Sequence, residues 1–291
     1  MRISGRTRTY GILGYPVGHS LSPVMQNAAF AQLKFDAAYL PFEVRPEDLR
    51  AALDGVRALG IAGVSVTIPH KEAVLAYLDD VDPEAAAIGA VNTVVNRDGR
   101  LIGYNTDGAG FLAALKSEAR FAPKKRNVLI LGAGGAARGI AHTVASAGAA
   151  SLVIANRTVS HADLMAQGLS HHFPYLKVRT CDLNPAAMEP HLASAHLVIQ
   201  TTSLGMKPTD PSPLPAKLFR KDHVVCDIVY TQETPLLKAA RSRGAKVSGG
   251  LGMLIHQGAA AVFLWTGRRP NLNVMKQALV AGIRAKSARK R

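Results

Sequence analysis

One segment constrains the fold more than any other: an apolar run leads into a glycine-rich turn and then an alanine-rich helical stretch. Residues 128–131 read as a buried parallel strand, and Gly132, Ala133, Gly134, Gly135, Ala136 and Ala137 follow as G-x-G-x-x-A. The first glycine permits a tight turn, the second lets the backbone approach a pyrophosphate, and the small third residue allows close packing of helix on strand. The pattern predicts a Rossmann-type dinucleotide site, with a merely tight strand–helix connection as the alternative.

The end of the next strand indicates which dinucleotide is bound. Asn156, Arg157 and Thr158 stand there, and no acidic residue occurs from 151 to 161. An acid at this place binds the ribose 2′-hydroxyl of NAD, whereas an arginine accommodates the 2′-phosphate of NADP. We therefore expect NADP, the alternative being that Arg157 is an ordinary surface arginine.

Strand-like and helix-like patterns alternate on both sides of residue 108, which predicts an α/β protein with two domains and a mainly parallel first sheet. Residues 206–215 contain four prolines and should form a surface loop. No strand pattern separates the last two helical segments. The expected strands cover 10–13, 38–42, 61–68, 128–131, 152–155, 197–199 and 224–228. The expected helices cover 23–33, 46–59, 252–266 and 271–285, and a further helix follows the glycine turn and ends at 147.

Composition excludes several classes of protein. With 48% hydrophobic residues the chain can bury a full core, so it is not disordered. Cys181 and Cys226 are too far apart for a C-x-x-C pair, and we expect buried free thiols. No apolar run reaches membrane-spanning length and no secretory segment is evident, so the expected location is the cytoplasm.

The formal charge is +15, but it is concentrated at the ends of the chain. Removing the three arginines of residues 1–8 and the five basic residues of 284–291 from +15 leaves +7. We interpret Lys286, Arg289, Lys290 and Arg291 as a solvated terminus rather than a site for specific nucleic-acid recognition.

Two serines stand before the first helical pattern. Ser22 suits the N-cap and Pro23 the first helical position, which explains both residues structurally. Alternatively, the hydroxyls of Ser20 and Ser22 beside a helix N-terminus hold a carboxylate. The residues alone leave these two interpretations equally open.

Other polar residues stand near strand ends. Lys71 follows a strand of the first domain, where ligands of open parallel sheets gather, or it faces solvent as most lysines do. Asn92, Asn105 and Asp107 lie in Gly-flanked segments, which either form polar turns or surround a polyhydroxylated substrate. A turn at Asp98 and Gly99 connects these segments as a hairpin.

Histidines offer no metal site in the sequence. There are ten, without an H-E-x-x-H or similar cluster, so we expect no metal. We interpret His19 and His70 as packing or solvent-exposed residues.

The chain resembles the shikimate dehydrogenase family from Gly11 to about Gly267. The resemblance rests on 14–27, 66–71, 89–93, 105–108, 132–138, 156–158, 202–206, 227–230 and 250–257. It implies a substrate-binding domain over 1–108, a Rossmann NADP-binding domain over 109–249, and C-terminal helices over 250–291 that pack on the first domain. It also implies oxidation of shikimate to 3-dehydroshikimate with NADP, or the reverse reduction, in the synthesis of chorismate and aromatic amino acids.

The resemblance implies a role for each matching residue. Ser20 and Ser22 would hold the substrate carboxylate, and Lys71 and Asp107 would form the proton-transferring pair. Further substrate contacts would come from Thr67, Asn92, Tyr230 and Gln257. Contacts to NADP would come from Gly132, Ala133, Gly134, Gly135, Ala136, Asn156, Arg157, Thr158, Thr201, Met206, Ile228, Gly250 and Met253. The partners would be small molecules, with no membrane, and the protein a monomer or homodimer.

Four positions depart from the family pattern: Ser65 and Gln200 where Asn is common, Gly249 where Asp is frequent, and His161 where a further Arg or Lys helps bind the 2′-phosphate. One alternative is therefore a quinate/shikimate dehydrogenase with mixed NAD and NADP use. A second is a basic nucleotide-sensing protein without catalysis, which predicts salt-dependent DNA binding. The presence of Lys71 together with Asp107 disfavours the second.

Overall fold

The computed structural model describes residues 3–207 and 209–288. The chain forms two compact units, one made of Met1–Thr106 with Ile255–Arg291 and the other of Asp107–Leu254. The sequence-based boundaries were placed at 108/109 and 249/250, a few residues from these.

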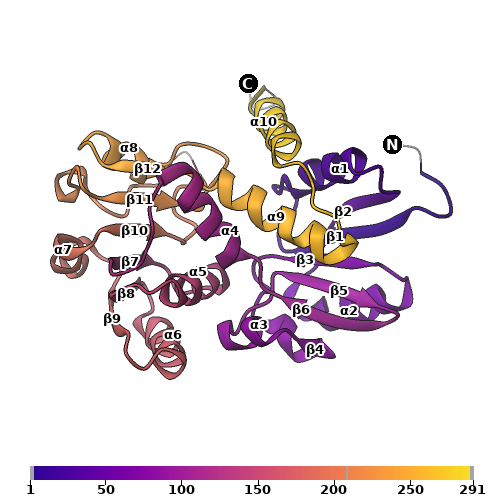
Figure 1. Cartoon of the computed structure of the whole chain (residues 1–291), viewed down its shortest axis with the longest axis horizontal. Coiled ribbons are helices and arrows are strands. Elements are labelled where there is room, and N and C mark those ends of the chain that lie inside the picture. The colour runs from indigo at the N-terminus through magenta and orange to yellow at the C-terminus, as the bar shows by residue number, and fades with distance from the viewer. Residues whose placement is uncertain (1–2, 208, 289–291) are drawn as a thin grey trace. The chain divides into compact units, whose positions relative to one another are not determined.

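The first unit contains a six-stranded sheet in the order β2-β1-β3-β5-β6-β4 (Figure 1). Strands β2, β1 and β3 are parallel, whereas β5 is antiparallel to both β3 and β6, and β4 is parallel to β6. The hairpin turns at Asp98 and Gly99, both with positive φ, as predicted. The strands are β1 (Arg8–Gly14), β2 (Ala37–Glu43), β3 (Gly63–Val66), β4 (Asp80–Val81), β5 (Thr93–Arg97) and β6 (Arg100–Tyr104).

Both faces of this sheet are covered, because successive side chains of a strand point to opposite faces. On one face Leu13 and Val64 pack with Leu53 of α2. On the other, Tyr10 lies 5.1 Å from the Phe30 ring and 5.2 Å from the Trp265 ring. The helices of the unit are α1 (Ser22–Gln32), α2 (Leu49–Ala58), α3 (Pro83–Ile88), most of α9 (Leu251–Thr266), and α10 (Leu272–Ala288).

The second unit contains a six-stranded sheet in the order β12-β11-β10-β7-β8-β9, with every pair parallel. If the strands of this unit are numbered 1 to 6 from β7 to β12 and the sheet is read from β9 to β12, the order is 3-2-1-4-5-6. This is the doubly wound arrangement of dinucleotide-binding domains. The strands are β7 (Asn127–Leu131), β8 (Ser151–Asn156), β9 (Lys177–Asp182), β10 (Leu197–Gln200), β11 (Val224–Asp227) and β12 (Lys246–Ser248), and the helices α4 (Asp107–Ala114), α5 (Gly135–Ser146), α6 (Val159–His172), α7 (Pro185–Ser194) and α8 (Pro235–Arg241).

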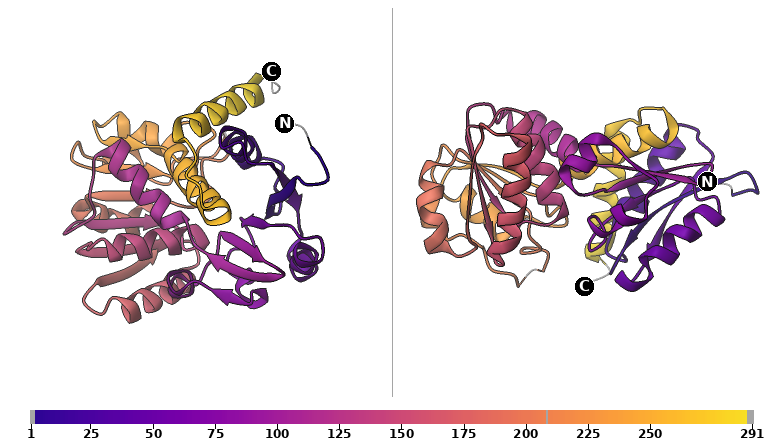
Figure 2. Two further views of the ribbon diagram at one scale, coloured as in Figure 1. Left: turned by 45° about the vertical axis from the view of Figure 1, so that its right-hand side comes forward. Right: turned by 90° about the horizontal axis from the view of Figure 1, so that it is seen from below.

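Helices lie on both sides of this second sheet (Figure 2). Strand β7 shows why: Val128 and Ile130 belong to a core that includes Ile140 of α5, while Leu129 and Leu131 belong to a core that includes Leu192 of α7. A strand apolar on both faces therefore becomes the centre of a three-layer unit.

Several sequence-based boundaries were wrong. The strand expected at 61–68 covers only Gly63–Val66, because the backbone N–H of Ile61 still bonds to Val56 at the end of α2. The strand expected at 224–228 ends at Asp227, whose carboxylate accepts the N–H of Val229 and turns the chain. Strand β9 was missed because its side chains are mostly polar, and β12 because it has three residues.

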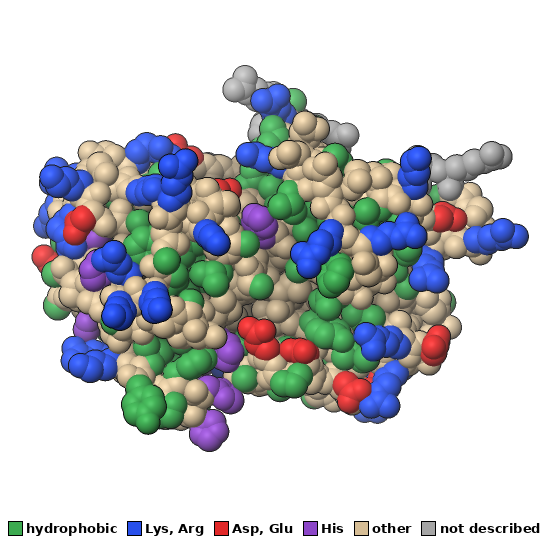
Figure 3. Space-filling view, viewed as in Figure 1, with side chains coloured by type: hydrophobic (Ala, Val, Ile, Leu, Met, Phe, Trp, Pro, Cys, Tyr) green, Lys and Arg blue, Asp and Glu red, His purple; other side chains and the backbone are tan. Residues whose placement is uncertain are grey.

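The cysteines and the basic residues differ partly from expectation. Cys226 is buried and free, and burial raises its pKa to about 12, whereas Cys181 is only half-buried. Lysine and arginine side chains are scattered over the face shown in Figure 3. The residues 289–291 lie outside the described part of the chain. Lys286 is not simply solvated, because its Nζ donates to the carbonyl of His19 at 2.7 Å. Among the described helices, none is long and apolar enough to cross a membrane.

Candidate functional site

In the first unit, one edge of the sheet collects most of the predicted site residues. Strands β1 and β3 are parallel and end at Gly14 and Val66, so the segments that follow them leave from the same edge. Strand β6 ends at this edge too, and β5 begins there, because β5 is antiparallel to both β3 and β6. Consequently Ser20, Thr67, Asn92 and Thr106 all belong to loops at one edge.

The serine loop joins β1 to α1. Our N-cap assignment was wrong by one residue: Ser22 is the first helical residue, and the N-cap is Leu21, whose side chain makes no capping hydrogen bond. Instead, the Ser20 Oγ accepts the Ser22 N–H at 3.2 Å, so the hydroxyl before the cap satisfies a helix-terminal donor. The Ser22 hydroxyl therefore has no capping role, although the residue is buried.

The segment after β3 is fixed by close backbone packing. A Cβ on Gly14 would lie 2.4 Å from the Thr67 Cγ2, so glycine at that position makes room for Thr67. Lys71 is half-buried, and its carbonyl accepts the N–H of Val91, just before the Asn92 loop. His70 is buried with its Nε2 2.7 Å from the Val44 carbonyl oxygen, which confirms that it is a packing residue.

Asn92 is the centre of a polar network. Its Oδ1 accepts the Thr106 N–H at 2.8 Å and the Thr93 hydroxyl at 3.0 Å, and its Nδ2 donates to the Thr106 Oγ1 at 2.9 Å. The same Nδ2 lies 3.4 Å from the Gln257 Oε1 on α9. The fold thus joins two predicted substrate contacts that are 165 residues apart. Thr93 and Thr106 are participants that the sequence did not single out.

In the second unit, the glycine turn begins where β7 ends. Gly132 has φ of +110°, and a Cβ there would lie 2.5 Å from the Thr201 Oγ1 after β10. The strands β7 and β10 are neighbours from which the chain winds in opposite directions, and ligands bind at this switch point in open parallel sheets. Thr201 is fixed there because its hydroxyl donates to the Leu131 carbonyl at 2.7 Å.

The turn leaves room for an anion. Gly134 is the exposed N-cap of α5, and a Cβ added there would meet no atom within 4 Å. Helix α5 begins at Gly135 with Ala136 in its first turn, so backbone N–H groups at its start have no helical partner. Open space beside such donors fits the pyrophosphate of a dinucleotide.

The segment after β8 lies at the same edge. Asn156 ends β8, and its Nδ2 donates to the Thr158 carbonyl at 2.8 Å, which closes a turn around Arg157. Arg157 and His161 are both exposed. The turn places Arg157 at the end of β8, the strand paired with β7, and an arginine at this position can bind a 2′-phosphate.

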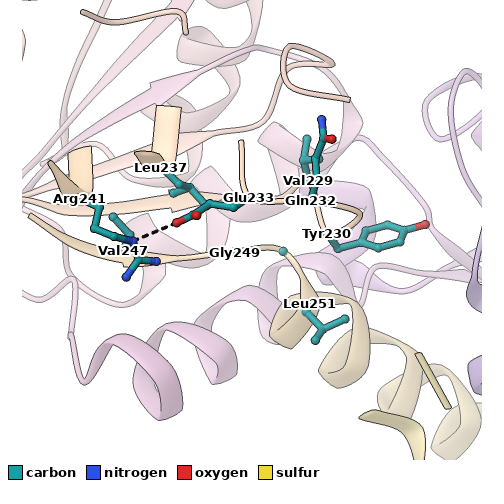
Figure 4. A pocket seen from close by; sticks show the side chains of 10 residues that line it. Val229, Tyr230, Gln232, Glu233, Leu237, Arg241, Val247, Gly249 and Leu251 are labelled. Carbon is teal, nitrogen blue, oxygen red and sulfur yellow. Dashed lines mark hydrogen bonds and ion pairs between the residues drawn. The ribbon is translucent and has the colours of Figure 1, made fainter. Parts of the chain in front are cut away.

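The segments that follow β11 and β12, together with α8, line a pocket of about 300 Å³ in the second unit. Its lining includes Tyr230, Gly249 and Gly250, and in Figure 4 the Tyr230 ring points away from the Glu233–Arg241 ion pair, whose atoms are 2.9 Å apart. Gly250 is obligatory, because a Cβ there would lie 2.0 Å from the Ile228 carbonyl oxygen. Gly249 lines the pocket without a side chain.

Two buried polar groups shape these loops, and the sequence did not predict either role. Gln200 is fully buried, and its amide binds Thr202 and the Leu204 carbonyl, which fixes the turn before Met206. Asp227 accepts the Val229 N–H at 3.0 Å and the Thr234 hydroxyl at 2.7 Å. Burial raises the pKa of Asp227 to about 6, although both hydrogen bonds oppose that shift.

The other predicted residues of the second unit are placed as follows. Asp107 is the first residue of α4 and is buried, and the adjacent Gly108 packs so closely on α5 that a Cβ would lie 1.9 Å from the Thr143 hydroxyl. Met253 is buried near the start of α9 and Met206 is exposed. Ala133 is buried, and Ile228 is half-buried at the end of β11. Within the described ranges, no group of His, Cys, Asp and Glu is arranged to hold a metal ion.

Three family models match successive parts of the chain. They are described as "Shikimate dehydrogenase substrate binding domain" over 12–94, "Shikimate / quinate 5-dehydrogenase" over 114–207, and "Shikimate 5'-dehydrogenase C-terminal domain" over 250–280. The first two matches fall in different structural units.

Individual relatives cover nearly the whole chain. The NADP(+) shikimate dehydrogenase of Moorella thermoacetica is 50% identical over 289 residues, which is 99% of this chain and 97% of the relative. A crystal structure of a shikimate dehydrogenase in complex with NADP+ is 42% identical, with a TM-score of 0.90, and covers 97% of this chain and 98% of its own. The enzyme of Thermus thermophilus, solved with NADP(H) and shikimate, is 40% identical, with a TM-score of 0.83 and coverage of 94% and 98%.

Proposed function

The chain belongs to the shikimate dehydrogenase family, and from this premise we propose that it interconverts shikimate and 3-dehydroshikimate with NADP(H). This reaction is a step in the synthesis of chorismate and the aromatic amino acids. The observation that carries the proposal is that each unit has polar loops at a single sheet edge: hydroxyls, amides and an ammonium in one, and an anion-binding turn in the other. Such a division suits an enzyme that must bind both a polyhydroxylated acid and a dinucleotide.

In this proposal the second unit binds NADP. The start of α5, with Gly132, Gly134 and the alanines of the turn, would hold the pyrophosphate. Arg157, with Asn156 and Thr158, would bind the 2′-phosphate. Thr201, Met206, Ile228 and Gly250, together with Met253 near the start of α9, would contact the nicotinamide.

The first unit would bind the substrate. Ser20 and Ser22 beside the N-terminus of α1 would hold its carboxylate, and the Asn92–Gln257 pair with Thr67 would bind its hydroxyl groups. Tyr230 would be a further substrate contact. Most of these residues lie in loops at strand ends or, like Ser22, at the start of the helix that follows. Gln257 lies on α9, which contacts the Asn92 loop through it.

Lys71 and Asp107 would handle the proton. When bound, the nicotinamide cofactor supplies the hydride in reduction and accepts it in oxidation. In reduction the Lys71 ammonium donates a proton to the carbonyl oxygen as hydride reaches the carbon, and in oxidation Lys71 takes the hydroxyl proton. Asp107 would be the second member of this proton-transferring pair.

The proposed setting is the cytoplasm, where a biosynthetic step can draw on a diffusible NADPH pool, with the protein as a monomer or homodimer. Steady-state kinetics with shikimate and quinate, each with NADP and NAD, test the function directly. We expect shikimate with NADP to give the highest kcat/KM. Equal efficiency with quinate would favour a quinate/shikimate dehydrogenase, and no turnover of any pair would reject catalysis.

A further inference from the structure

The C-terminal helix reaches the loop that carries Ser20 and Ser22. Lys286 on α10 donates from its Nζ to the backbone oxygen of His19, 267 residues away in the chain. Helix α10 packs along the first turn of α1, where a Cβ on Gly282 would lie 3.4 Å from a methyl carbon of Leu21. Gly282 and Lys286 are four residues apart and share one helix face, so this packing delivers Lys286 to the loop.

Hydrogen bonds hold the backbone of the loop over residues 17–22 at Val17, Ser20 and Ser22. The Ser20 N–H bonds to the Val17 carbonyl at 2.9 Å, the Val17 N–H to the Glu43 Oε2 at 3.3 Å, and the Ser22 N–H to the Ser20 Oγ. The bond from Lys286 acts on the carbonyl between His19 and Ser20. Because a peptide unit is planar, fixing this carbonyl also fixes the direction in which Ser20 leaves it.

The loop also has a positive electrostatic environment. Helix α1 has eleven residues, begins at Ser22, and has no acidic residue in its first turn, so its N-terminal partial charge is not neutralised there. Burial and, after it, the charge of Lys286 lower the pKa of His19. Glu43 is the acidic side chain bonded to the loop, and it contacts the backbone of Val17.

We propose that Lys286 is a positioning residue of the carboxylate site: it orients the 17–22 loop through the His19 carbonyl and adds a positive charge that favours an anionic substrate. This inference rests on the proposed function, in which Ser20 and Ser22 hold the carboxylate of shikimate. It gives the C-terminal helix a role in substrate selection.

The test compares shikimate with its uncharged methyl ester in wild type and in Lys286→Met, Lys286→Arg and the control Lys276→Met, which alters an exposed lysine on the same helix. We expect Lys286→Met to raise KM for shikimate about three- to tenfold with kcat within about twofold, the scale of a partly exposed charge. The KM for NADP should change by less than about twofold, and the inhibition constant of the ester should rise less than the KM for shikimate, because the ester depends on the orientation of the loop but not on the charge. Lys286→Arg should restore most of the affinity, and Lys276→Met should match wild type.

The outcomes separate this inference from the proposed function. Turnover of shikimate by wild type tests the function, whereas the ratio of shikimate to ester affinity tests Lys286. No loss of affinity for either ligand would overturn the role of Lys286, and an equal loss for acid and ester would overturn its electrostatic part; both outcomes leave the function intact. Higher ionic strength should weaken shikimate binding more in wild type than in Lys286→Met, because salt screens the charge.

Discussion

Lys71 is the residue on which the proposed chemistry depends most. Replacing it with alanine removes the group that exchanges a proton with the reacting oxygen, and positioned proton transfer contributes about 10² to 10⁴ in rate. We therefore expect Lys71→Ala to lower kcat at least about a hundredfold, with a smaller change in KM for shikimate. Lys276→Ala, at an exposed position of α10, is the control. A turnover close to that of wild type would remove Lys71 from the reaction.

Arg157 determines the choice of cofactor in the proposal. The guanidinium can form charge-assisted hydrogen bonds to a 2′-phosphate, and such bonds contribute about 1.5 to 3 kcal/mol. Arg157→Ala should therefore weaken NADP binding about ten- to a hundredfold and leave NAD binding nearly unchanged, as measured by titration calorimetry. Arg179→Ala, at an exposed position on β9, is the matched control. Equal weakening of both cofactors would contradict the assignment.

Asp227 should make stability depend on pH. Burial raises its pKa from 3.8 to about 6 in the folded protein, so the folded state binds this proton more tightly than the unfolded state does. Its contribution to stability is therefore greatest below about pH 4 and declines as pH rises to about 6, by up to about 3 kcal/mol.

Asp227→Asn removes this titration while an amide can still bond to Val229 and Thr234. We expect the free energy of unfolding in urea, relative to wild type, to rise for Asp227→Asn between pH 4 and 6. For Asp98→Asn, on the exposed hairpin turn, the free energy of unfolding should change with pH as it does in wild type. Parallel profiles for both variants would show that Asp227 does not titrate in this range.

At the scale of elements, the docking of α9 on the first sheet depends on the absence of one side chain. A Cβ on Gly63 would lie 2.3 Å from the Trp265 Nε1, which donates to the Val94 carbonyl at 3.0 Å. Gly63→Ala should therefore lower the unfolding free energy by about 1 to 3 kcal/mol through overpacking. Gly55→Ala, in α2 with no atom near its new Cβ, should instead stabilise by about 0.5 to 1 kcal/mol. Thermal unfolding measures both, and equal melting temperatures would refute the packing claim.

The elements that the sequence predicted well are those with strong local patterns. Strand β7, its glycine turn and α5 were predicted because apolar periodicity and glycine placement are local properties. The hairpin at Asp98 and Gly99 was predicted for the same reason. Strand β9 was missed because its partner β8, not its own composition, holds it in the sheet.

At the scale of the whole molecule, the proposal assigns one ligand to each structural unit. NADP at a hundred times its dissociation constant should stabilise the part of the chain that binds it by about 2.7 kcal/mol. Hydrogen exchange should therefore slow in β7, α5 and neighbouring elements with NADP, and in β1, β3 and α1 with shikimate. Protection by NADP confined to residues of the first unit would contradict the division of roles.

By itself, the sequence determined the α/β class, the dinucleotide turn and the family, and its motifs indicated most of the candidate site. These features depend on residue type and spacing over short stretches, which local sterics and hydrophobic periodicity control. Only the tertiary structure decided that Gln257 contacts Asn92 and that Lys286 donates to the His19 carbonyl. It also decided that Asp227 and Gln200 are buried and hold their loops by hydrogen bonds. Contacts across 165 or 267 residues follow from how elements pack, and burial alters the chemistry of a side chain only once that packing exists.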